Sequence, residues 1–318
     1  MKKKHRLVNF KSRLIVFLVL LISTFARGEN LTESFSLSGD LLPSPFLYFN
    51  SDRDDNYIFL VEKRSQQFYV LHIKDSTLQI VTKYTCSTGK ISGDKNEVGD
   101  LKTPEGIYFI RAEKDPQTLA LIYGAGAYVM DYPNSFDKIY KKNGYGIWIH
   151  GTDEPERIKN SNDTKGCIVL KNEDFLELIN YVKMNITPVL IVNELVYRKK
   201  QYVDDDKKRI FSFLQFWENS WETKQLDDFL ECYSKKFYYN NMNKSGYKNY
   251  KKRVFKQYNN IDIQISSIQV FSDQAHFVIN FYQNYQTELY HDFGIKQLYI
   301  IIEENQLKIL KEVWTKIQ

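Results

Sequence analysis

The sequence predicts a β-rich α+β protein in which two domains follow an export segment. At 318 residues the chain is long enough for two ordinary domains, and its 43% apolar and 15% aromatic content can fill two cores. Runs of β-branched and aromatic residues dominate from Tyr57 to Val192. From residue 207 onward, helical spacing comes first and long strand-like runs follow. That order is typical of an α+β cone around one curved antiparallel sheet.

Residues 1–28 have the layout of a secretory signal peptide. A basic group made of Lys2, Lys3, Lys4, Arg6, Lys11 and Arg13 precedes the apolar run 14–22. The small residues Ala26 and Gly28 follow, and we expect cleavage after one of them. An uncleaved membrane anchor is the alternative, although the apolar run is short for a full span.

The positive net charge of the chain belongs to this segment. It carries seven of the 44 Lys and Arg residues and none of the 39 Asp and Glu residues, so the net charge changes from +5 to −2 when it is removed. The composition therefore gives no reason to expect a nucleic-acid partner. Membrane contact is expected only through the signal segment, if it stays uncleaved.

The cysteines and histidines indicate neither a disulfide framework nor a metal site. Cys86, Cys167 and Cys232 are odd in number and far apart, so at least one thiol has no partner within the chain, while a Cys86–Cys232 bridge stays open. No CxxC or HExxH pattern occurs, and the histidines lack ligand spacing. We expect no metal and no other cofactor.

Residues 29–54 read as an N-terminal arm. The segment is polar and is interrupted by Pro43 and Pro45 around the apolar patch 46–49. We expect an arm that packs on the surface of its own chain, and a homodimer contact is the alternative.

The first domain is predicted over residues 55–195. Its strands are expected at Tyr57–Val61, Gln67–His72, Leu78–Cys86, Ile107–Arg111 and Val189–Val192, with a helix at Asn172–Met184 in which Asn172 is the N-cap. Two turns punctuate these strands, Ser87-Thr88-Gly89 and Thr103-Pro104-Glu105-Gly106.

One stretch of this domain carries a pattern suited to chemistry. An apolar run leads into His150-Gly151, and a polar loop returns to Gly166-Cys167 and a second apolar run. A cysteine becomes a good nucleophile when a neighbouring group makes it a thiolate, and histidine is a common means. Gly166 allows close backbone approach, with amides available to a developing oxyanion. The pair indicates acyl transfer, whereas either residue alone would read as a core cysteine or a turn histidine.

Four short motifs, in order, extend this interpretation. Ser87-Thr88-Gly89, Thr103-Pro104-Glu105-Gly106, His150-Gly151-Thr152 and Thr164-Lys165-Gly166-Cys167-Ile168 together resemble the L,D-transpeptidase catalytic domain, the YkuD family. The resemblance covers residues 55–195. It implies a β-sandwich-like catalytic domain that acts on peptidoglycan stem peptides.

The resemblance also implies roles for individual residues. Cys167 would be the nucleophile and His150 its base, with the Gly151 carbonyl orienting the imidazole. The amides of Gly166 and Cys167 would form the oxyanion hole. Thr152, Thr164 and Lys165 complete the oxyanion and substrate-binding set that the resemblance implies.

Two positions depart from the family pattern. Thr164 stands where the family usually has Ser, and it keeps the hydroxyl. Val169 stands where the family usually has Arg, so an expected clamp for a carboxylate or the backbone is missing. Lys165 is a candidate for a replacement positive charge, and a solvated loop lysine is the alternative.

The second domain is predicted over 207–318, after a linker at 196–206. Ile210, Phe213, Leu214, Phe216, Trp217 and Trp221 recur at helical spacing, a short helix follows around Phe229, and strands are expected at Ile261–Phe271, Ala275–Gln286, Lys296–Glu303 and Gln306–Trp314. The pattern resembles the nuclear transport factor 2-like fold.

Two groups of residues in this domain have a structural and a functional reading. The basic run Lys248, Lys251, Lys252, Arg253 reads as a solvated helix face, with an anionic glycan as the alternative partner. Tyr282, Tyr285, Tyr290 and Tyr299 read as packing or as the lining of a pocket inside the cone.

This pair of domains behind an export signal resembles the cell-shape L,D-carboxypeptidases of curved and helical Gram-negative bacteria. The resemblance implies a periplasmic enzyme that removes the terminal D-alanine from tetrapeptide stems. An L,D-transpeptidase, which passes the same acyl group to an amine, is the first alternative. A wall-binding protein with vestigial catalytic residues is the second.

Overall fold

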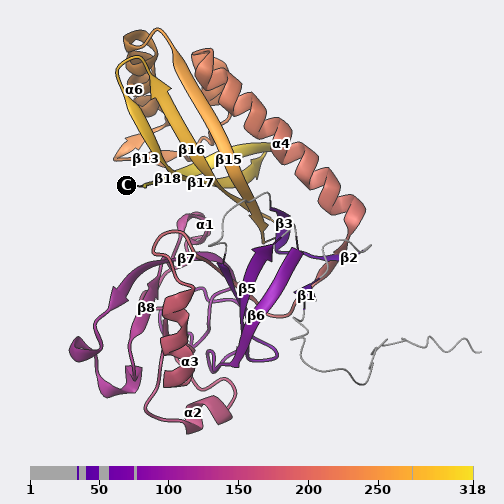
Figure 1. The fold of residues 1–318 in the computed structure, drawn as a ribbon, viewed down its shortest axis with the longest axis vertical. Coiled ribbons are helices and arrows are strands. Elements are labelled where there is room, and N and C mark those ends of the chain that lie inside the picture. Colours follow the sequence, from indigo (N-terminus) through magenta and orange to yellow (C-terminus); the bar gives the residue numbers. More distant parts are fainter. Residues whose placement is uncertain (1–33, 36–40, 50–56, 75–76, 274, 318) are drawn as a thin grey trace, which may run out of the picture. The chain divides into compact units, whose positions relative to one another are not determined.

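The computed structural model describes residues 34–35, 41–49, 57–74, 77–273 and 275–317 (Figure 1). The predicted signal peptide, residues 1–28, lies outside the described residues. None of the described helices combines the length and the apolar character that a membrane crossing requires.

The elements follow in chain order. The strands are β1 (Ser34–Phe35), β2 (Leu41–Pro43), β3 (Phe46–Phe49), β4 (Tyr57–Glu62), β5 (Gln67–Lys74), β6 (Thr77–Thr85), β7 (Gly106–Lys114), β8 (Ala127–Met130), β9 (Trp148–His150), β10 (Ile168–Val169), β11 (Pro188–Val192), β12 (Tyr197–Lys199), β13 (Tyr238–Tyr239), β14 (Met242–Asn243), β15 (Ile261–Ser272), β16 (Phe277–Thr287), β17 (His291–Glu303) and β18 (Gln306–Lys316). The α-helices are α1 (Ser135–Ile139), α2 (Glu156–Lys159), α3 (Asn172–Glu177), α4 (Lys200–Glu222), α5 (Leu226–Glu231) and α6 (Lys244–Gln257). Short 3-10 helices occupy Pro116–Thr118, Leu121–Tyr123 and Leu178–Asn180.

A nine-stranded mixed sheet forms the first domain, in the order β1-β6-β5-β4-β11-β7-β8-β9-β10. The interior strand β4 contains an apolar run, residues 58–61, that is fully buried. Such a run is typical of a strand covered on both faces. At the far end of the sheet, β9 and β10 pair in parallel, and this end carries the predicted His150 and Cys167.

The predicted helix at Asn172–Met184 is shorter and begins differently. It is α3 followed by one 3-10 turn, and its N-cap is Lys171, not Asn172. The Asn172 side chain is used elsewhere: its Oδ1 accepts the Ala125 N–H at 2.8 Å and its Nδ2 donates to Asp153 at 2.8 Å. An amide that bridges two loops is not available to cap its own helix.

The second domain has the predicted α+β order. Helix α4 is followed by α5, α6 and a five-stranded antiparallel sheet in the order β18-β17-β16-β15-β3 (Figure 1). Trp217 and Trp221 of α4 pack with Phe229 of α5 and Phe281 of β16 in one buried core. The α+β, β-rich fold class expected from the sequence is confirmed.

The segment 196–206 is structured in full and is not a free linker. Strand β12 pairs with β2, and α4 begins at Lys200. An i,i+4 ion pair of Lys200 with Asp204 and the burial of Val203 stabilise the first turns of the helix. The charged composition of this stretch therefore marks the exposed face of a helix.

The predicted N-terminal arm contributes strands to three sheets. Strand β1 pairs with β6 of the first domain, β2 pairs with β12, and β3 pairs with β15 of the second domain. Phe46 is fully buried, which agrees with an arm that packs on its own chain. The homodimer alternative stays a prediction.

The two domains share a buried cluster. Phe136 of the first domain packs against Tyr299 and His276 of the second, with ring centroids 5.2 and 4.5 Å apart. Tyr299 also donates to Asp131 of the first domain at 3.3 Å. Tyr299 thus belongs to the domain junction and not to a pocket inside the cone.

The basic run of α6 is not uniformly solvated. Lys252 is exposed as predicted, but Lys251 is only 4% exposed and its Nζ lies 3.5 Å from the ring centre of Trp221. The helical period turns position 251 toward the core, where the Lys251 ammonium makes a cation–π contact with the Trp221 ring.

Candidate active site

Strands β9 and β10 bring His150 and Cys167 to the same end of the sheet. The parallel register pairs Ile168 with Ile149 and Val169 with His150, and Cys167 directly precedes β10. Alternate residues of a strand share a face, so Cys167 lies on the face that carries His150. In the described structure no hydrogen bond joins the thiol and the imidazole. The Cys167 Sγ donates instead to the Gly146 carbonyl at 3.3 Å.

The imidazole of His150 is fixed by its neighbour. Nδ1 lies 2.6 Å from the Gly151 carbonyl oxygen. A carbonyl can only accept, so Nδ1 carries the proton and Nε2 keeps its lone pair. The His150 side chain is buried, and the Tyr123 ring packs edge-on against it with centroids 4.9 Å apart. The arrangement leaves Nε2 as the group that is able to take a proton.

Thr164 and Gly166 shape the loop that ends at Cys167. The Thr164 hydroxyl donates to the Cys167 carbonyl at 2.7 Å and accepts the Gly166 N–H at 3.0 Å. Gly166 has φ of +126°, and a Cβ there would lie 2.6 Å from the Lys102 carbonyl oxygen. Only glycine fits this backbone without displacement.

The two amides expected to form an oxyanion hole differ in availability. The Gly166 N–H is already engaged by the Thr164 hydroxyl. Among the described residues, no acceptor meets the Cys167 N–H. The oxyanion hole stays a prediction, and the Cys167 amide is its free donor.

The remaining predicted site residues lie around this loop. Lys165 is exposed. Thr152 is buried, and its hydroxyl accepts the Glu154 N–H at 3.1 Å, so it stabilises the turn after His150.

Hydrogen bonds connect three of the sequence motifs, those at residues 87–89, 103–106 and 164–168. Ser87 and Val169 exchange two backbone bonds of 2.9 Å, and the Thr164 N–H donates to the Thr88 carbonyl at 3.0 Å. The Thr103 hydroxyl accepts the Gly89 N–H at 2.9 Å and donates to the Gly166 carbonyl at 3.0 Å. Motifs up to 80 positions apart in the sequence therefore fix the conformation of a single loop, the one that ends at Cys167.

Burial keeps the two reacting groups uncharged at rest. Burial raises the pKa of the Cys167 thiol, against the opposing effects of the Trp148 N–H and of Arg157 and Lys95. Burial also lowers the pKa of His150 to about 4, although the Gly151 carbonyl opposes this and Arg157 adds to it. At neutral pH the pair is a thiol and a neutral imidazole.

The other two cysteines are not part of the site. Cys86 and Cys232 are both free thiols, so the Cys86–Cys232 bridge left open by the sequence is absent. Burial raises the pKa of each to about 12, which makes them poor nucleophiles.

Sequence reasoning did not assign three residues to the site, and it read one of them, Asn172, only as a helix N-cap. Tyr123 packs on His150, Arg157 lies in the loop between β9 and β10, and Asn172 bridges two glycine turns. A Cβ at Gly124 or Gly151 would lie 2.1 or 2.3 Å from the Asn172 Oδ1. The pairing of these glycines with one asparagine is visible only in three dimensions.

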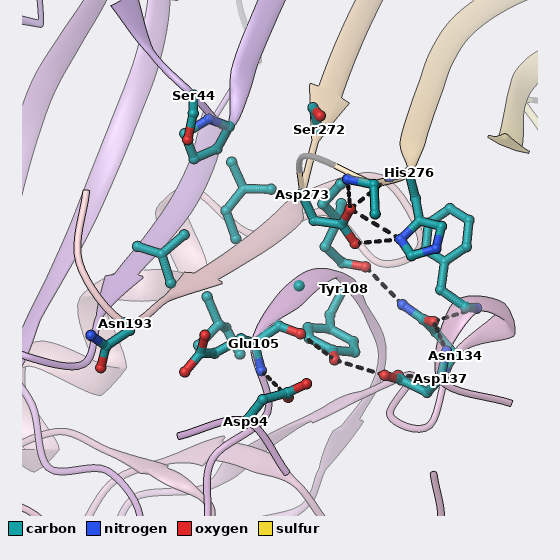
Figure 2. A pocket seen from close by; sticks show the side chains of 18 of the residues that line it. Ser44, Asp94, Glu105, Tyr108, Asn134, Asp137, Asn193, Ser272, Asp273 and His276 are labelled. Carbon is teal, nitrogen blue, oxygen red and sulfur yellow. Dashed lines mark hydrogen bonds and ion pairs between the residues drawn. The ribbon is translucent and has the colours of Figure 1, made fainter. Parts of the chain in front are cut away.

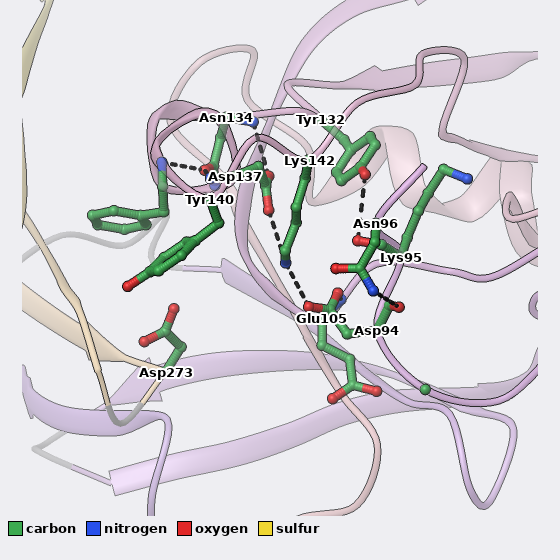
Figure 3. A network of polar contacts seen from close by, with 12 residues as sticks. Asp94, Lys95, Asn96, Glu105, Tyr132, Asn134, Asp137, Tyr140, Lys142 and Asp273 are labelled. Atoms are coloured by element: carbon green, nitrogen blue, oxygen red, sulfur yellow. Dashed lines mark hydrogen bonds and ion pairs between the residues drawn. The ribbon is translucent and has the colours of Figure 1, made fainter. Parts of the chain in front are cut away.

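A separate cavity of about 650 Å³ lies between the two domains (Figure 2). Its lining includes Asp94, Glu105, Asp137, Asp273 and His276 but neither Cys167 nor His150. Figure 3 shows the polar network at one wall, where Lys142 joins Asp94 at 2.5 Å and Asp137 at 3.2 Å. These carboxylates already have ionic or hydrogen-bonding partners within the protein, so the side chains that line the cavity form ionic contacts at the domain junction.

In the part of the chain that the structure describes, no three His, Cys, Asp or Glu side chains converge as metal ligands.

Comparisons with known proteins identify both domains. The L,D-transpeptidase catalytic domain model, YkuD, matches residues 56–191, and the Cds6 C-terminal NTF2-like domain model matches residues 209–313. A search of curated proteins found no match.

Two solved structures are similar over most of the chain. Bd1075 of Bdellovibrio bacteriovorus is 28% identical with a TM-score of 0.72, and the match covers 88% of this chain and 99% of that protein. Pgp2 of Campylobacter jejuni, described as a helical cell shape determining protein, is 27% identical with a TM-score of 0.65, covering 85% and 94%. The chain therefore carries a YkuD-family L,D-transpeptidase catalytic domain followed by an NTF2-like domain of the Cds6 C-terminal family.

Proposed function

We propose that this protein is a peptidoglycan L,D-carboxypeptidase that uses Cys167 as nucleophile and His150 as base. The observation that carries the proposal is the tautomer of His150. Its Nδ1–H is committed to the Gly151 carbonyl, and its basic Nε2 is left on the face of the sheet that carries Cys167.

The reaction begins from the neutral pair. As the substrate carbonyl approaches, Nε2 takes the thiol proton and Sγ attacks the carbonyl carbon of the third stem residue, a diamino acid. The Cys167 N–H donates to the oxyanion that forms. When the tetrahedral intermediate collapses, the C–N bond breaks and the imidazolium returns its proton to the amine of the departing D-alanine. The product of this half-reaction is a thioester on Cys167.

Water completes the cycle. Nε2, now neutral again, takes a proton from water as the oxygen attacks the thioester carbonyl, and the thiolate leaves and recovers that proton. The tetrapeptide stem becomes a tripeptide. The neutral resting state fits this sequence, because charge develops only when a substrate is present to accept it.

Transfer to an amine is the alternative, since the YkuD family is named for L,D-transpeptidation. The two reactions share every step up to the thioester and differ in the acceptor. We favour water as the acceptor because the two-domain arrangement resembles that of the cell-shape L,D-carboxypeptidases. We also propose that this protein influences cell shape, which the similarity to Pgp2, described as a helical cell shape determining protein, supports.

We further propose that the protein is exported to the periplasm. The support is the basic, apolar and small-residue layout of residues 1–28. Cell fractionation with a C-terminal tag tests this, and a cytoplasmic full-length product would refute it.

The function is tested with purified protein lacking residues 1–28 and a disaccharide-tetrapeptide. We expect tripeptide and free D-alanine by mass-resolved chromatography, and neither with Cys167→Ala. Cross-linked or exchanged products would reassign the protein as a transpeptidase. If Cys167→Ala cells keep their shape and the variant still binds sacculi, the protein is a wall-binding protein.

A further inference from the structure

Arg157 is a cation beside the site without an anionic partner. It belongs to α2, the short helix in the loop that leaves His150 and returns to Cys167. Its side chain is half-buried, and its Nη1 donates to the Ile122 carbonyl at 3.5 Å, the outer limit of a hydrogen bond. Among the described residues, no carboxylate lies within ion-pair distance of this guanidinium.

The contact with Ile122 places Arg157 on the rim of the site. Tyr123, the next residue, packs against the His150 ring at 4.9 Å and against the Trp148 ring at 5.0 Å. The chain of contacts from Arg157 through the 3-10 helix at Leu121–Tyr123 thus ends on the imidazole. In agreement, the positive charge of Arg157 acts on both groups: it opposes the rise in the pKa of Cys167 that burial causes, and it adds to the fall in the pKa of His150 that burial causes.

The nearby lysines are less suited to hold an anion at this place. Lys159, two residues along α2, is exposed and pairs with Glu156 at 2.6 Å. Lys95 pairs with Asp100 at 2.5 Å. Lys165 is exposed in the Cys167 loop. A half-buried guanidinium also presents a planar fork that matches the two oxygens of a carboxylate, which an ammonium does not.

We propose that Arg157 forms a carboxylate subsite of the active site, which binds the free C-terminal carboxylate of the residue that leaves. The identity of that residue rests on the proposed function, whereas the presence of an anion subsite beside Cys167 does not. The subsite selects stems that end in a free carboxylate and positions the bond to be cut over the thiol. Arg157 is then a determinant of specificity that acts by binding substrate.

The subsite is tested first without any peptide, by alkylating Cys167. Iodoacetate and iodoacetamide react in the same way and differ in one negative charge. We measure both rates by mass spectrometry and compare their ratio between proteins, so intrinsic reactivity cancels. Arg157→Gln is expected to lower the iodoacetate to iodoacetamide ratio about fivefold, as for one partly solvated charge pair. Cys86 and Cys232 are buried, and Cys167→Ala measures their background.

Two variants make the result specific. Lys159→Gln removes the same charge from the same helix, and its ratio is expected to stay within about twofold of the parent, because exposed charges are screened. Arg157→Lys is expected to restore part of the ratio, since it returns the charge without the fork. Equal melting temperatures verify that the variants are folded. An unchanged ratio in Arg157→Gln overturns the subsite, and a drop seen only in Lys165→Gln assigns the charge to Lys165.

The second test compares a tetrapeptide stem with the same stem ending in D-alaninamide. The parent protein is expected to prefer the free acid by kcat/KM, and Arg157→Gln to lose about tenfold or more on the acid and little on the amide. Equal losses on both would overturn the assignment of the leaving carboxylate. If neither stem is cleaved by the parent, the proposed function fails while the alkylation ratio still decides the subsite.

Discussion

The Cys167 loop is held by uncharged hydrogen-bonding groups beside a neutral imidazole, whereas the core of the second domain contains a buried ion pair and a buried lysine. The Cys167 loop is held by the hydroxyls of Thr164 and Thr103. In the second domain, Lys296 pairs with Glu312 at 2.9 Å in a site where both are nearly fully buried. Lys251 lies over the Trp221 ring in the same core.

The difference reflects what each region does. A loop held by uncharged hydrogen bonds fixes geometry and lets a proton move when substrate arrives, since no ion pair between the thiol and the imidazole has to be broken first. A buried ionic cluster fixes one packing arrangement and makes stability depend on pH, because each charge is desolvated. The comparison predicts that pH acts on chemistry in the first domain and on folding in the second.

The largest effect is expected for His150→Gln. Removing the base should lower kcat/KM about a thousandfold, because a general base contributes ~10²- to 10⁴-fold. In the parent protein the neutral imidazole is the active form, so activity should be lost only as pH falls through about 4, the pKa to which burial lowers this group. The pH profile of kcat/KM measures this. If activity instead falls at a pH near the ordinary histidine pKa, burial does not desolvate His150 in the resting site, which would contradict the comparison.

Gly166→Ala should come next. The side chain would meet the Lys102 carbonyl at 2.6 Å in a backbone with φ of +126°, so we expect a loss of about 3 kcal/mol in the free energy of unfolding and loss of activity. Denaturant unfolding of Gly99→Ala is the control. Gly99 also has positive φ, +80°, but open space around it, so its cost should be about 1 kcal/mol. Equal losses in the free energy of unfolding for the two variants would show that the Cys167 loop can shift to accommodate a side chain at position 166.

Sequence reasoning reached the parts of the site that motifs carry and missed those that packing creates. His150 and Cys167 each adjoin a glycine between strand-like runs, and the structure places His150 at the end of β9 and Cys167 directly before the neighbouring strand β10. The contact of Arg157 with Ile122 spans 35 positions of the sequence, and that of Tyr123 with His150 spans 27, so no local pattern encodes either of them. The tertiary use of Asn172 likewise overrode its local capping tendency.

In the second domain, apolar periodicity predicted the strands better than charge predicted exposure. Long runs with strand composition in the second domain became β15 to β18 because their burial on one sheet follows directly from periodicity. Charged runs were less informative, since charge marks exposure only on average. Lys251 stands among exposed basic residues, and its burial depends on Trp221 of another helix.

Lys251→Met tests the charged side of the comparison and should have the smallest effect at neutral pH. Burial lowers the pKa of Lys251 to about 7 in the folded state, below its ordinary value of 10.5. Between these values the unfolded chain binds a proton that the folded chain does not, so this group makes the parent more stable as pH rises from about 7 toward 10. Below about 7 the folded protein holds a desolvated ammonium, and the variant, which lacks it, should equal or exceed the parent in stability by about 1 kcal/mol.

The stability advantage of the variant should therefore shrink with rising pH in denaturant unfolding, while Lys252→Met, a variant of the exposed neighbouring lysine, shows no such slope. Parallel pH profiles for Lys251→Met and the parent would mean that the Trp221 face and Glu312 compensate the buried charge in full, and the two domains would then handle charge alike.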